Sequence, residues 1–154
     1  VMDAQAGAEA MFSIITALLS RANLIHDVGF LEYGSTSSLE MITMANELIA
    51  MSRFYVQGIP VNDGTLALEA IERVGRGGPG SIFLMDDHTY DHFMEALFLP
   101  NLLDRSRYDA WEKDGALNFY NRCNKEAKKI LVEHEVDPKP DAVLEEIEQI
   151  VKSS

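Results

Sequence analysis

The chain has 154 residues, 47% of them hydrophobic, which is enough for one core of ordinary domain size. It carries 13 lysines and arginines against 25 aspartates and glutamates, a formal net charge of −12, and so has no electrostatic attraction for nucleic acid or anionic membranes. Its one cysteine, Cys123, excludes an internal disulfide framework and a four-cysteine zinc site. With no disulfide framework, we expect a reducing, cytoplasmic setting. No apolar run approaches the roughly 18–20 residues that span a bilayer.

The first predicted elements are a helix and a strand that follows it almost at once. Apolar residues recur at helical spacing between Glu9 and Leu19, and the helix is expected to end near Arg21. Residues 23–34 then form the only convincing buried strand. Unpaired backbone groups cost of order 1–3 kcal/mol each when buried, and the rest of the chain supplies no neighbouring strands. We therefore expect a fragment, the C-terminal part of an α/β protein.

Helices dominate the remainder of the chain. Ser37 and Glu40 stand in the relation of a capping box and predict a long helix that ends before the Gly-Ile-Pro sequence at 58–60. Residues 81–85 are expected to be a short strand or a buried extended arm. Further helices are predicted from Asn62 or Asp63 to Gly75, from Asp86 or Asp87 to Phe98, from Ser106 to Lys113, from about Ala116 to Glu135 and from about Asp141 to Lys152.

Polar residues interrupt the predicted strand. Strand alternation would place His26 and Glu32 on one face and Asp27 and Tyr33 on the other. A polar side chain on a buried strand must be paired or functional. On pattern alone, a histidine satisfied by hydrogen bonds in the core is the more frequent case.

A second histidine pattern is His88 and His92, spaced i, i+4 near Asp87 and Asp91. This spacing can bind zinc and permits a metal-dependent hydrolase as a hypothesis. The glutamate that follows the first histidine of a metalloprotease helix is absent, so a capped, solvated or interface helix end is the preferred interpretation and no metal site is predicted.

Two further patterns have structural interpretations. The glycine-rich run 75–80 lacks the P-loop lysine and the Rossmann spacing, which favours a flexible connection. Aromatic residues at helical spacing are usually core, and we expect this of Phe93, Phe98, Trp111, Phe119 and Tyr120.

Four segments together resemble the C-terminal part of the trimethylamine methyltransferase family: Asp-Ala-Gln-Ala-Gly at 3–7, the run 24–34, Asp-His-Thr at 87–89 and Leu-Pro-Asn-Leu-Leu-Asp-Arg at 99–105. The resemblance implies a large α/β barrel enzyme that demethylates trimethylamine or related quaternary amines such as betaines. Members pass the methyl group to the cobalt of a separate corrinoid protein, and trimethylamine-specific members carry pyrrolysine upstream of this region.

The resemblance implies that this chain is about the last third of such an enzyme. The expected fold is mostly α with one or two short strands, the C-terminal segment of a TIM-type α/β barrel. Residues 1–105 would hold late barrel strands and helices, and residues 106–154 a C-terminal helical extension. A homo-oligomer is expected, and the corrinoid (cobalamin) would be carried by the partner protein, with no cofactor and no metal bound by this chain.

By resemblance and strand geometry, we predict His26 as a catalytic residue at the barrel mouth, unless it contacts the corrinoid protein or holds a loop. Tyr33 and Glu32 would bind the small cationic substrate through cation–π and Coulomb interactions. Asp3 and Gln5 would orient the substrate from the end of the preceding strand. The alternative, from another class of protein, is a small helical interaction domain without catalysis.

Overall fold

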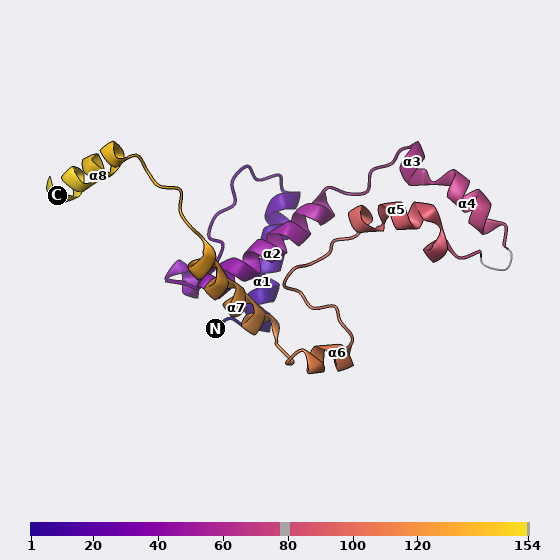
Figure 1. The fold of residues 1–154 in the computed structure, drawn as a ribbon, viewed down its shortest axis with the longest axis horizontal. Coiled ribbons are helices and arrows are strands. Elements are labelled where there is room, and N and C mark those ends of the chain that lie inside the picture. Colours follow the sequence, from indigo (N-terminus) through magenta and orange to yellow (C-terminus); the bar gives the residue numbers. More distant parts are fainter. Residues whose placement is uncertain (78–80, 154) are drawn as a thin grey trace.

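Three helices form the centre of the structure, a computed structural model that describes residues 1–77 and 81–153. Helix α1 (Ala4–Leu19) packs along α2 (Leu39–Val56), and α7 (Phe119–Glu133) packs against another side of α2 (Figure 1). The other elements are β1 (Phe30–Leu31), β2 (Thr36–Ser37), α3 (Asp63–Leu66), α4 (Leu68–Gly75), α5 (Asp87–Ala96), α6 (Tyr108–Lys113), α8 (Asp141–Ser153) and the 3-10 turns η1 (Glu32–Gly34) and η2 (Phe83–Met85).

The core lies where the three central helices meet. Helix α2 contributes one stripe of buried side chains because residues three and four apart share a helix face. Small residues, among them Ala45, allow the neighbouring helices to approach closely. The buried cluster comprises Ala6 and Ile14 of α1, Met41, Met44, Ala45 and Leu48 of α2, and Cys123 of α7.

Side chains that accept backbone N–H bonds define several helix starts. Asp3 caps α1, Asp86 caps α5 and Asn62 forms a capping box with Thr65 at the start of α3. The long helix begins one residue later than the capping box predicted, because Ser38 accepts the N–H of Met41 at 3.2 Å. That helix ends at Val56, as Pro60 predicted.

The predicted helix from Asn62 or Asp63 to Gly75 is interrupted. Ala67 has φ 49° and ψ 39°, a left-handed conformation that ends α3 and precedes α4. Helices α5, α6, α7 and α8 confirm the other helical predictions within a few residues.

The buried strand predicted over 23–34 is wrong. Strand conformation is limited to Phe30–Leu31, which pairs antiparallel with Thr36–Ser37 in a two-stranded sheet. Left-handed φ values of 62° at Asp27 and 52° at Glu32 break the alternation, so the predicted division into two strand faces does not form. The prediction of a mostly helical chain with one or two short strands is confirmed.

Residues 81–85 form neither a strand nor a buried arm. Phe83–Met85 make the turn η2, where Leu84 is 81% and Met85 77% exposed. The glycine-rich run 75–80 lies partly outside the described residues, which omit 78–80.

The aromatic residues expected in the core are only partly covered. Phe119 packs against the core cluster, and Phe98 lies 6.0 Å from Phe54 between ring centroids. Phe93 and Tyr120 are exposed, so the core prediction is wrong for these two.

Figure 1 shows helices extending from the centre in two directions: α3, α4 and α5 on one side, and α8 alone at the other end. Large apolar side chains are exposed on both sides, including Leu68 of α4 at 66% and Val151 of α8 at 70%. Monomeric domains rarely expose so much apolar surface, so we expect other protein surface to cover these faces. Within residues 1–77 and 81–153, no helix is both long and apolar enough to cross a membrane.

Candidate functional site

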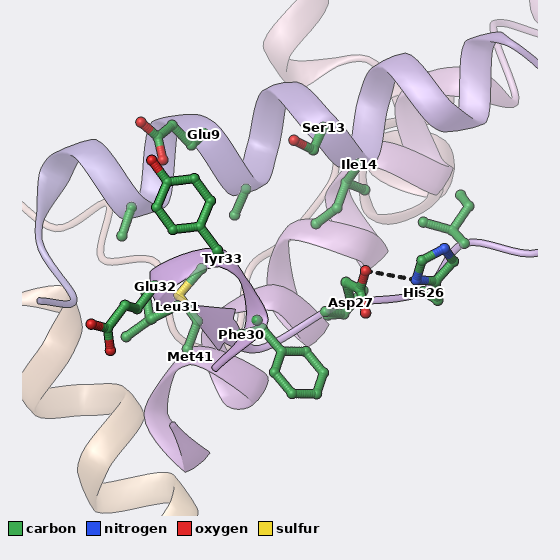
Figure 2. A pocket seen from close by; sticks show the side chains of 15 residues that line it. Glu9, Ser13, Ile14, His26, Asp27, Phe30, Leu31, Glu32, Tyr33 and Met41 are labelled. Carbon is green, nitrogen blue, oxygen red and sulfur yellow. Dashed lines mark ion pairs between the residues drawn. The ribbon is translucent and has the colours of Figure 1, made fainter. Parts of the chain in front are cut away.

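A cavity of about 400 Å³ lies between α1 and the loop that precedes α2. Helix α1 supplies Glu9 and Ser13 to its wall, and the loop supplies residues 25–28 and 30–34. Figure 2 shows Tyr33 beside Glu9, with Glu32 near one end of the loop and His26 and Asp27 at the other. The cavity therefore brings together three of the predicted site residues, His26, Glu32 and Tyr33.

The loop is held by a close approach at Gly29. This residue has φ +89°, and a Cβ there would collide with the Ile42 side chain and lie 3.2 Å from the Ile42 Cα. The carbonyl of Gly29 accepts the N–H of Ser38 at 3.1 Å, which ties the loop to the start of α2. Only glycine fits this position without displacing α2.

Two non-glycine residues of the site have strained backbones. Glu32 has φ 52° and Tyr33 φ 56°, both in the left-handed region that side chains rarely adopt. Such conformations cost of order 1–3 kcal/mol each and cluster at functional sites. Bonds from Ser35 Oγ to the Glu32 carbonyl at 2.5 Å and from Thr36 Oγ1 to the Glu32 carboxylate at 2.9 Å hold this turn.

The walls of the cavity combine carboxylates with aromatic rings. Glu9, Asp27 and Glu32 are its acidic residues, and Phe30 and Tyr33 are its rings. The sole cationic candidate among the residues that line it is His26, whose Nδ1 lies 2.8 Å from Asp27 Oδ2. An acidic wall with accessible π faces suits a small organic cation, which is attracted by both.

The His26–Asp27 pair is exposed, with 78% and 69% of the two side chains accessible. Tyr33 is fully exposed. These side chains are therefore available to a ligand or to a covering surface. A histidine satisfied in the core, the more frequent case on pattern alone, is not what the structure shows.

Asp3 and Gln5 line a neighbouring cavity of about 590 Å³ that shares Glu9 and Glu32 with the first. Both residues also have local roles. Asp3 Oδ1 accepts the N–H groups of Gln5 and Ala6 at 3.0 and 3.1 Å, and Gln5 Nε2 donates to Glu9 Oε1 at 2.8 Å. The five predicted site residues thus occupy two adjoining cavities.

Sequence reasoning missed Glu9 and did not assign Phe30 to the site. The signal for Glu9 was its i, i+4 spacing from Gln5, which places both on one face of the first helix. No local pattern pointed to Phe30, because its position depends on the turns at Gly29 and Glu32.

The second histidine pattern forms a ring contact. The centroids of His88 and His92 are 4.5 Å apart, His88 Nε2 lies 3.1 Å from the Gly64 carbonyl and His92 Nδ1 lies 2.5 Å from Glu95 Oε1. No cluster of three or more histidine, cysteine, aspartate or glutamate side chains suited to a metal ion occurs in the described part of the chain.

A buried carboxylate that the sequence did not reveal fixes the segment 99–105. Glu47 is 3% exposed and accepts the N–H groups of Leu102 and Leu103 at 2.8 and 3.3 Å. Arg122 of α7 donates to the Leu102 carbonyl at 2.6 Å from the other side. Helices α2 and α7 together hold this segment.

Asp104, within the held segment, and Cys123 of α7 have shifted pKa values. Hydrogen bonds from the side chain and backbone of Ser106 lower the pKa of Asp104, and Arg122 adds to the effect. Burial raises the pKa of the Cys123 thiol to about 11, so the thiol stays protonated.

Comparison with known proteins assigns the family. The model of the family described as trimethylamine methyltransferase (MTTB) matches residues 1–153. The chain belongs to this family. A trimethylamine methyltransferase of Desulfitobacterium hafniense (strain DCB-2) is 36% identical over 154 residues, 100% of this chain and 30% of the relative. A glycine betaine methyltransferase of D. hafniense (strain Y51) is 34% identical over 148 residues, 94% of this chain and 30% of the relative.

A third relative comes from a methanogen. The trimethylamine methyltransferase MttB2 of Methanosarcina mazei is 32% identical over 151 residues, 98% of this chain and 30% of that protein. The chain thus spans about 30% of the length of the curated relatives that it matches. The resemblance to the trimethylamine methyltransferase family is confirmed, and the match includes every segment on which it was based.

Proposed function

We propose that this protein is a methyltransferase that takes a methyl group from trimethylamine or a related quaternary amine or betaine and transfers it to a corrinoid protein. This chain would be the C-terminal part of the enzyme. Residues 1–105 would contribute late strands and helices of a TIM-type barrel, and residues 106–154 a helical extension. The enzyme would be a cytoplasmic homo-oligomer.

The observation that carries the proposal is the acidic, aromatic cavity between α1 and the loop at 25–34. The quaternary ammonium group of a betaine has no N–H to donate and protonated trimethylamine has only one, so a protein recognises such cations mainly through π faces, negative charge and shape. The cavity offers Phe30 and Tyr33 as rings and Glu9 and Glu32 as carboxylates. Relatives named for trimethylamine and for glycine betaine support the same class of substrate.

Each predicted residue has a proposed role. Tyr33 would place its ring against the methyl groups of the substrate, and Glu32 would supply negative charge next to it. His26, oriented by Asp27, would act at the rim of the cavity, where methyl transfer would take place. Asp3 and Gln5 would orient the substrate indirectly, because Asp3 fixes the start of α1 and Gln5 holds Glu9.

In this proposal a corrinoid carried by the partner protein would supply the cobalt that accepts the methyl group. This chain's own task is to hold the amine at a fixed position and orientation. A well-placed ring contributes roughly 0.5–2 kcal/mol to the binding of a cation. Replacing Tyr33 with alanine should therefore raise KM by about two- to thirtyfold.

The experiment measures methyl transfer by the enzyme with its corrinoid partner, comparing Tyr33→Ala with Tyr33→Phe and Glu32→Gln with Glu112→Gln. Tyr33→Phe keeps the ring and should keep most of the binding, and Glu112 is an exposed control on α6. His26→Ala should lower kcat at least about tenfold, within the range of a positioned catalytic side chain. Equal effects of Glu32→Gln and Glu112→Gln, or an unaffected His26→Ala enzyme, would refute these roles.

The interaction-domain alternative predicts a free-standing fold with little exposed apolar surface. Exposed apolar residues on α4, η2 and α8 favour a chain that is covered by other protein. A monomer with a cooperative melting transition and no methyl transfer activity would favour the alternative.

A further inference from the structure

Helix α8 presents an apolar stripe with acidic flanks. Val143, Leu144, Ile147 and Val151 share one helix face and are 40%, 46%, 43% and 70% exposed. Four acidic residues of α8 outnumber its one basic residue, Lys152. Helix α8 is amphipathic but exposed along its whole length, so it lacks the packing of an apolar face that supplies most helical stability.

The connection to α7 directs α8 away from the rest of its own chain. Residues 134–140 contain Pro138 and Pro140, which fix their own φ angles and confine Asp137 and Lys139 to extended conformations. His134 continues this path with φ −78° and ψ 117°. Figure 1 shows α8 at the far end of the molecule, at the end of this extended segment. A tight reversal that would fold α8 back onto its own α7 is disfavoured.

Helix α7 has the complementary surface. Four of its residues are basic and two are acidic, and Lys125 and Lys129 lie on the side opposite its buried residues, Cys123 and Ala127. Val132, one turn after Lys129, is 85% exposed, and the adjacent Leu131 is 66% exposed. Apolar residues beside basic flanks on α7 match an apolar stripe with acidic flanks on α8.

We propose that α8 docks on α7 of a second copy of this chain, so that two copies exchange their last helices. Two copies of α8 packed against each other would bring Glu146 and Glu148 against like charges, which disfavours that arrangement. The exchange is self-complementary, as expected for a two-fold dimer, and is a form of domain swapping. It does not depend on the methyl transfer reaction.

Charge reversal in the full-length protein tests the proposal. Variant A carries Lys125→Glu and Lys129→Glu on α7, and variant B carries Glu146→Lys and Glu148→Lys on α8. A control carries Glu69→Lys and Asp91→Lys on α4 and α5, which change the net charge as variant B does. Sedimentation velocity over a concentration series measures self-association of each variant and of an equimolar mixture of A and B.

We expect the dimer dissociation constant of A alone and of B alone to rise by at least about tenfold, and the control to match the unmodified protein. In the mixture, each reversed helix meets its opposite on the other copy, so mixed dimers should recover to within about threefold of the original affinity. Recovery also shows that A and B are folded.

Three results would overturn the proposal. The first is that the unmodified protein remains a monomer at every concentration. The second is that neither A nor B changes self-association, as would happen if another part of the polypeptide covered α8. The third is that A and B both weaken association but fail to complement each other when mixed, which would place α8 on its own α7.

Discussion

Removing the Glu47 carboxylate tests the two hydrogen bonds, here called the Glu47 clamp, that hold the segment 99–105. Glu47 Oε1 accepts N–H bonds from Leu102 at 2.8 Å and Leu103 at 3.3 Å, and its residue is 3% exposed. In Glu47→Ala both amides lose their partner within the interior. In Glu47→Gln the amide oxygen can still accept, so only the charge is lost.

The magnitude follows from these two bonds. Hydrogen bonds to a charged group contribute about 1.5–3 kcal/mol each, and the longer bond to Leu103 belongs at or below the lower end. Glu47→Ala should therefore lower the free energy of unfolding by about 3 kcal/mol, and Glu47→Gln by about 1 kcal/mol.

Two assays together measure this effect. Denaturant titration gives the free energy of unfolding, and amide hydrogen exchange at Leu102 and Leu103 reports the clamp itself. Those two amides should exchange about a hundredfold faster in Glu47→Ala, while amides in the middle of α1 follow global stability only. Equal losses of stability in the two variants, or unchanged exchange at Leu102 and Leu103, would refute the reasoning.

Three further predictions concern the loop, the thiol and an ion pair. Gly29→Ala should destabilise the protein by about 2 kcal/mol more than Gly34→Ala, because both have positive φ but only the Gly29 Cβ would meet other atoms; equal unfolding midpoints would contradict this. Cys123, with its pKa raised to about 11, should resist alkylation at pH 8 until denaturant is added, and rapid labelling of native protein would argue against its burial. Hydrogen bonds from Arg73 lower the pKa of Asp86 below its ordinary 3.8, so the stabilisation is present above that pH and is lost as pH falls through the lowered value. Thermal melts of wild type and Asp86→Asn should therefore differ at pH 7 and converge in acid; a difference that persists in acid would contradict this.

Much of the helical structure could be predicted from local chemistry. Asn62 and Asp86 cap helices in the structure as in the sequence, and Pro60 marks the end of α2 correctly. These signals work because a cap or a proline acts on neighbours within four residues. The break at Ala67 could not be predicted, because alanine ordinarily favours a continuous helix.

The loop at 23–34 shows why an apolar, alternating sequence can mislead. Its pattern is that of a buried strand, yet left-handed conformations at Asp27, Gly29 and Glu32 turn the chain so that only two residues pair. Gly29 and Gly34 in this run are compatible with either a strand or a loop that turns. The residues predicted for the site nevertheless line cavities together, since the same turns gather them against α1.

Contacts between distant residues were beyond prediction. Glu47 reaches Leu102, and Asn124 donates to Glu40 at 2.6 Å, across more than fifty residues in each case. Neither carboxylate differs in local sequence from an exposed helical glutamate. Only the packing of α7 on α2 determines which polar side chains become buried.

Methyl transfer by the whole protein with its corrinoid partner, followed by the change of the Co(I) spectrum to that of methyl-Co(III), is the decisive test of the proposed activity. Trimethylamine and glycine betaine are tested in turn as donors. We predict conversion with one of the two, at a rate that falls in Tyr33→Ala and Glu32→Gln. No conversion with either donor, given a corrinoid partner that is competent with another methyltransferase, would contradict the proposed activity.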